Sequence, residues 1–85
     1  MNRDEAVLVI SELLQICAKM DDVYLCMVPP TASTPIATGG YQIHIKTTPS
    51  FDKETETCID TVTKKHQLSA QEIKEEEKMI IYKEH

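Results

Sequence analysis

The pattern of apolar and polar positions divides the chain into segments of different type. In residues 2–20, apolar side chains recur at helical spacing, and Asn2 with Glu5 has the separation of an N-terminal capping box. This spacing predicts a first helix with one broad apolar face. Leu8 falls among its polar positions, where a single exposed leucine is common. The predicted apolar face comprises Ala6, Val9, Ile10, Leu13, Leu14, Ile16, Cys17 and Met20.

Two short segments after this helix have the pattern of strands. Residues 23–28 are apolar and rich in side chains that favour extended backbone, and residues 41–47 alternate strictly between apolar and polar. We expect the two to pair as a hairpin in which residue numbers sum to 70. A shift of one residue would turn His44 and Lys46 into the core, so the hydrophobic pattern favours this register.

The second half of the chain repeats this order less clearly. A hydroxyl residue before Pro49 is a usual helix entry, and a weaker helical stripe follows at Phe51, Thr55, Cys58, Ile59, Val62 and His66. The tail favours two strands, at about 68–74 and 78–83, over a single helix. The pattern thus predicts one α+β domain over residues 1–85. It is a two-layer αββαββ arrangement, with two helices on one face of a four-stranded, mostly antiparallel sheet.

Composition narrows the classes of function. The net charge of −5 argues against nucleic acid and against anionic membranes. No apolar run approaches the roughly 20 residues that span a bilayer, and the N-terminal residues do not resemble a signal peptide. The cysteines, Cys17, Cys26 and Cys58, form an odd and widely spaced set. This set argues against disulfides and predicts a reducing, cytoplasmic setting.

The predicted hairpin leaves one face of the sheet without a helix over it. Apolar side chains on that face would form a larger bare area than a monomer usually exposes, which is typical of an interface. We therefore predict a protein-interaction module that contacts a second copy, as a homodimer, or another protein. A ligand surface, or covering by the chain's own tail, is the alternative. The expected contact residues are Tyr24, Cys26, Val28, His44, Lys46 and Tyr82, with Gln42 at the edge.

The segment 29–40 contains three of the four prolines and both glycines, without a charged residue. Its prolines end the preceding strand, and its glycines give the backbone conformational freedom just before the next strand. A solvated hairpin tip is therefore the simpler interpretation. The alternative is a regulatory module that binds a small molecule or an anion through hydroxyls and backbone donors. The candidate binding residues are Thr31, Ser33, Thr34, Thr38, Gly39 and Gly40.

Two groupings of cysteine and histidine suggest chemistry. Cys26 beside His44 would suit a thiol-dependent enzyme, because an imidazole can lower the pKa of a thiol. The sequence indicates neither a third orienting group nor an oxyanion hole for it. Cys17, Cys58 and His66 fall on the core-facing stripes of two adjacent helices and are of the type that binds zinc, but not at the short spacings of small zinc sites. We therefore expect no catalytic residue, no metal and no cofactor.

Overall fold

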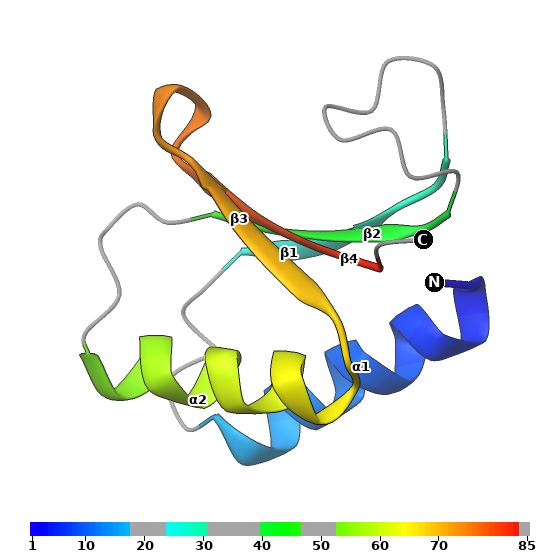
Figure 1. Ribbon diagram of the computed structural model, residues 1–85, viewed down its shortest axis with the longest axis horizontal. Helices are drawn as coiled ribbons and strands as arrows, with labels where there is room; N and C mark the ends of the chain where they lie inside the picture. The colour runs from blue at the N-terminus through cyan, green and yellow to red at the C-terminus, as the bar shows by residue number, and fades with distance from the viewer. Residues whose placement is uncertain (18–23, 31–39, 47–52, 84–85) are drawn as a thin grey trace.

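The computed structural model describes residues 1–17, 24–30, 40–46 and 53–83. Two helices lie on one face of a four-stranded sheet (Figure 1), as the sequence predicted. In chain order the elements are α1 (Arg3–Ile16), β1 (Leu25–Val28), β2 (Gln42–Lys46), α2 (Lys53–Lys65), β3 (Ser69–Ile73), the 3₁₀ turn η2 (Lys74–Glu76) and β4 (Lys78–Tyr82). The α+β class, the αββαββ order and the hairpin predicted for the tail are confirmed.

The strands follow the order β1-β2-β4-β3, and every neighbouring pair is antiparallel. Each αββ half forms a hairpin, and the two hairpins meet through their second strands, where Ile43 lies opposite Ile81. In the first hairpin Leu25 pairs with Ile45, so the predicted register, with residue numbers summing to 70, is confirmed. Strands β1 and β3 form the two edges of the sheet.

Helix α1 begins at the predicted cap. The Oδ1 atom of Asn2 accepts a hydrogen bond from the backbone N–H of Glu5 at 2.7 Å. The apolar face that α1 buries is narrower than the sequence predicted, because only one side of the helix meets the sheet. Its buried side chains are Ala6, Val9 and Leu13, whereas Leu14 and Ile16 are about half exposed.

The hydrophobic core lies between the helix layer and the sheet. Period-two alternation along β2 directs its isoleucines to the helix side, and the tail hairpin adds one more. The main contributors are Ala6, Val9 and Leu13 of α1, Ile59 and Val62 of α2, and Ile43, Ile45 and Ile81 of the sheet. Burial of these side chains is the principal driving force for the fold, at about 25 cal/mol per Å² of apolar surface removed from water.

The cysteines of the two helices are joined, which corrects the sequence-based expectation of unpaired thiols. Cys17 and Cys58 form a disulfide whose Cα atoms are 5.8 Å apart. The sequence had placed both residues on the core-facing stripes of two adjacent helices, without predicting a bond between them; in the structure they are joined although they lie 41 residues apart in the chain. Cys26 is free.

An ionic cluster adds a second link between the helices. Glu12 of α1 accepts from Lys65 Nζ at 3.0 Å, and its other carboxylate oxygen lies 2.9 Å from His66 Nε2. Hydrogen bonds from His66 and then Lys65 hold the pKa of the Glu12 carboxyl below its usual value of 4.5. Glu12 therefore marks the side of α1 that faces α2.

Within the described residues, no helix is both long enough and apolar enough to cross a bilayer.

Candidate functional site

The sheet face opposite the helices carries the residues that the sequence proposed as a contact. Cys26 lies opposite His44, which in turn lies opposite Ile80 on β4. Val28 lies opposite Gln42 in the neighbouring row. Since directly paired residues project to the same side of a sheet, these side chains share one face, as the register required.

This face is less open than the sequence pattern suggested. At its centre, Ile80 and Gln42 have no exposed surface and Tyr82 is only 8% exposed, although none of them belongs to the core cluster beneath the helices. Cys26, Val28 and His44 are half-buried, and Lys46 is exposed. Of the expected contact residues, Tyr24 is the most accessible of the large apolar ones, at 68%. The accessible apolar part of the face therefore lies toward β1.

His44 is engaged with an amide on its own strand. Its Nε2 atom lies 3.0 Å from Oε1 of Gln42. Burial lowers the pKa of the His44 imidazole below its usual value of 6.5, and the charge of Lys78 lowers it further, with Glu76 opposing. One ring nitrogen of His44 is thus engaged by Gln42, while the residue lies directly opposite Cys26 across the strand pair.

The loop proposed as an anion site falls mostly outside the described residues. These include Gly40 but not Thr31, Ser33, Thr34, Thr38 or Gly39. A Cβ atom on Gly40 would lie 2.8 Å from the backbone N of Met1, and Tyr41 N donates to Met1 O at 2.8 Å. Gly40 thus permits a close approach between two backbone segments, a structural role that the sequence pattern did not reveal.

The residues considered for zinc have other partners. Cys17 and Cys58 bond to each other, and His66 contacts Glu12. In the ranges that the structure describes, no group of three or more histidine, cysteine or acidic side chains has the geometry to hold a metal ion.

The sequence missed an apolar stripe on the outward side of α1. Val7 is 45% exposed and Leu14 is 46% exposed, and Ile10 between them is half-buried. At 3.6 residues per turn, each of the three lies within about 40° of the position diametrically opposite Glu12. Because Glu12 faces α2, the stripe faces away from it. The stripe could have been found from the separation of Val7 and Leu14, because residues seven apart lie on the same side of a helix.

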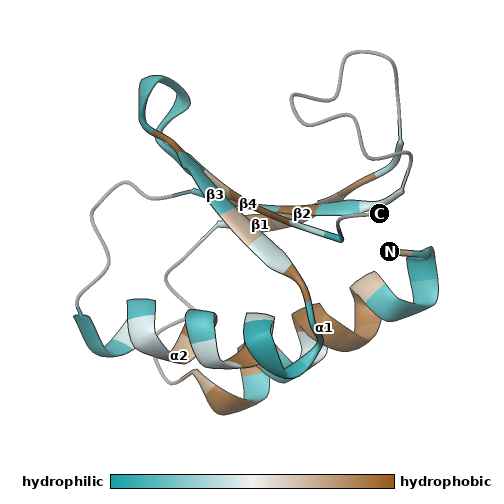
Figure 2. Cartoon of the chain, viewed as in Figure 1, coloured by the Kyte–Doolittle hydropathy of each residue, from teal (hydrophilic) through white to brown (hydrophobic). Residues whose placement is uncertain are grey.

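This stripe lies on the same side of the molecule as strand β1. Helix α1 packs mainly over β2 and helix α2 over β3, so the side of α1 that faces away from α2 is the side of the β1 edge. Figure 2 shows that α1 is more apolar along its length than α2. We call Val7, Ile10 and Leu14 together with strand β1 the α1/β1 side. None of these residues is charged, although the exposed Arg3, one turn before Val7, lies on the same side of α1.

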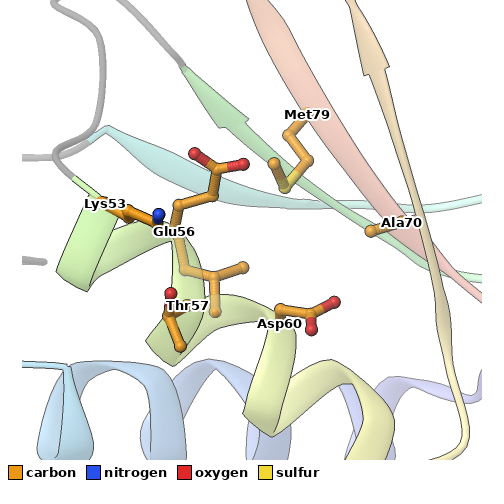
Figure 3. A pocket seen from close by; sticks show the side chains of 7 residues that line it. Lys53, Glu56, Thr57, Asp60, Ala70 and Met79 are labelled. Atoms are coloured by element: carbon orange, nitrogen blue, oxygen red, sulfur yellow. The ribbon is translucent and has the colours of Figure 1, made fainter.

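A pocket of about 520 Å³ opens on the opposite flank, between α2 and the β3–β4 hairpin. Figure 3 shows the side chain of Glu56 on α2 pointing toward the strands that carry Met79 and Ala70, with Thr57 and Asp60 elsewhere on α2. The lining mixes carboxylates, the amine of Lys53 and an apolar part formed by Ile59, Ala70 and Met79. Such a combination suits a small molecule with an apolar body and a polar end.

Comparisons with family models, curated proteins and solved structures found no match to this chain.

Proposed function

We propose that this protein acts by association with another polypeptide chain, through the α1/β1 side. The main support for this proposal is that large apolar side chains are exposed on one helix, beside an edge strand without charged residues. Apolar side chains scattered singly over a surface need no explanation, but a contiguous group is typical of a contact surface. Leu8 and Ile16 are also exposed, at 53% and 56%, but they lie on the Glu12 side of α1 and do not belong to this group.

The proposed contact differs in part from the one expected from the sequence. The centre of the open sheet face is already buried, so it offers little surface to a partner. Cys26 and Val28, which the sequence placed in the contact, belong to β1 and remain in the proposed surface, and Tyr24 directly precedes that strand. The contact is thus moved from the middle of the sheet to its β1 edge.

The disulfide bears on where such an association would take place. Disulfides persist in oxidising compartments and are rare in a reducing cytoplasm. The Cys17–Cys58 link therefore favours an oxidising setting over the cytoplasmic one expected from the cysteine count.

Site-specific photocrosslinking in the cells that produce the protein tests this proposal. A photoreactive residue replaces Leu14 in one variant and Glu54, exposed on α2, in the control. We expect the Leu14 variant to crosslink to a polypeptide, either a second copy or another protein, and the control to give no such product. Failure of both positions to crosslink would refute association through this side.

A second candidate function is the binding of a small molecule in the pocket beside α2. Its volume falls in the range of about 300–1,000 Å³ that is usual for ligand sites. Small amphiphilic amines, which would pair with Glu56 and Asp60, are suitable probes. Binding should shift the methyl resonance of Met79, and Ala70→Leu, which fills the pocket, should abolish the shift. An unchanged Met79 signal at millimolar probe would contradict this function.

A further inference from the structure

The charged side chains of the pocket beside α2 lie along one side of that helix. Lys53, Glu56 and Asp60 are separated by three and then four residues, so successive members are neighbours on the helix surface, with Cβ atoms about 5–6 Å apart. Along α2 the order is a cation followed by two carboxylates. The pocket therefore offers charges of both signs next to one another rather than a uniformly acidic wall.

These charges differ in whether they already have a partner. Lys64 Nζ lies 2.9 Å from Oδ2 of Asp60, one turn further along the helix. Within the described residues, neither Lys53 nor Glu56 has an ion-pair or hydrogen-bond partner for its side chain. Both side chains are exposed, and Figure 3 shows that of Glu56 pointing toward the strands. Lys53 and Glu56 are thus the two opposite charges that a ligand can pair with.

The rest of the pocket lining is apolar. Ile59 of α2 is only 1% exposed, and Met79 of β4 is half-buried. The small side chain of Ala70 on the neighbouring strand β3 leaves space beside them. A methionine side chain is flexible and polarizable, and its sulfur makes favourable contacts with aromatic rings. This part of the pocket therefore suits a flat apolar group.

We propose that the ligand of this pocket is an α-amino acid with an aromatic side chain. Its ammonium group pairs with Glu56, its carboxylate pairs with Lys53, and its ring lies against Met79. An α-amino acid carries its two opposite charges on one carbon atom, so it matches two opposite charges at neighbouring positions of a helix. This inference rests on the second candidate function, the binding of a small molecule in this pocket.

A ligand with a single charge fits the lining less well. An amine without a carboxylate pairs with Glu56 but finds a like charge in Lys53. An acid without an ammonium group pairs with Lys53 but meets the carboxylates of Glu56 and Asp60. The amino acid is neutral overall, so it also adds no charge to a chain whose net charge is −5. We therefore expect the amino acid to bind best and the simple acid to bind worst.

Titrations with three matched compounds, followed through the methyl resonance of Met79, test this inference. The probes are L-phenylalanine, phenethylamine, which lacks the carboxylate, and hydrocinnamate, which lacks the ammonium group. Physiological salt screens the long-range attraction of the amine to the acidic chain. We expect L-phenylalanine to bind about three- to fivefold more tightly than phenethylamine, which is the gain from one exposed ion pair, and hydrocinnamate to bind most weakly.

Substitutions of single charges assign the two ends of the ligand. Lys53→Gln should remove the advantage of L-phenylalanine over phenethylamine without weakening phenethylamine itself, because only the partner of the carboxylate is lost. Glu56→Gln should weaken both compounds. The control Lys46→Gln makes the same change of charge on the opposite face of the sheet and should keep the advantage. A full advantage retained in Lys53→Gln would overturn the assignment of the carboxylate to Lys53.

The outcomes separate this inference from the candidate function on which it rests. Equal affinities of L-phenylalanine and phenethylamine for the wild type overturn the amino acid as ligand but leave the pocket as a site for small amines. An unchanged Met79 resonance with all three compounds at millimolar concentration refutes both.

Discussion

Breaking the Cys17–Cys58 disulfide should remove a large part of the stability of the fold. The bond closes a loop with a sequence separation of 41 and ties the end of α1 to α2. In the loop-closure description, such a link lowers the entropy of the unfolded chain by about 13 cal/mol/K, or about 4 kcal/mol at 25 °C. A domain of 85 residues has a total unfolding free energy of about 4–13 kcal/mol. Reduction is therefore expected to bring the protein close to its unfolding threshold.

Urea denaturation with and without a reductant measures this effect. If the unfolding free energy falls by about 1.5 kcal/mol per M of urea, the expected loss of stability lowers the urea concentration at the unfolding midpoint by about 2–3 M. The double variant Cys17→Ala/Cys58→Ala should resemble the reduced wild type and should not respond to reductant. Cys26→Ala is the matched control, since it leaves the bond intact and should respond to reduction as the wild type does.

A reduced protein that lost less than about 1 kcal/mol would refute this reasoning. It would mean that the unfolded chain is already compact enough to keep the two helices together, so that the link removes little entropy.

The remaining predictions concern single side chains. Leu13→Ala should lower the unfolding free energy by about 2–5 kcal/mol and Leu8→Ala by less than about 0.5, because only Leu13 is buried; equal losses in urea titrations would contradict this. Gly40→Ala should cost about 1–3 kcal/mol and speed amide exchange at Tyr41, since the added methyl meets the backbone of Met1; unchanged exchange would argue against the close approach. The folded-state pKa of Glu12 lies below the usual value of 4.5. The stability that the Glu12 carboxylate contributes is therefore fully present above pH 4.5 and is lost as the pH falls through the lowered pKa. The stability difference between wild type and Glu12→Gln should therefore shrink in acid, and a constant difference between about pH 7 and pH 2 would refute the assignment.

The first half of the fold could be predicted because its two strands carry clear local patterns. Alternation in residues 41–47 permits only one face toward the core, and that constraint fixed the register with β1. The C-terminal segment was harder to assign. Residues 75–78 favour a helix, yet the apolar residues of the segment could not form one face of a helix. Two strands joined by a turn were the arrangement that buried Ile81.

What the sequence did not reveal depends on contacts between distant segments. The apolar positions of α1 span more of the helix than one sheet can cover, and periodicity does not tell which of them, such as Leu14, remain exposed. The disulfide required knowing that α1 and α2 meet at Cys17 and Cys58, which spacing along the chain does not indicate. The burial of Tyr82 likewise comes from the assembled molecule, since its side of the sheet carries no helix.

The position of β4 imposes an order on assembly. Residues 78–82 come after every other strand along the chain, yet they are inserted between β2 and β3. During synthesis the β1–β2 hairpin can form early, but the four-stranded sheet cannot be completed until Tyr82 has left the ribosome. Until then the β4-facing edge of β2, with Ile43 and Ile45, has no pairing strand, and such an exposed edge is prone to aggregation.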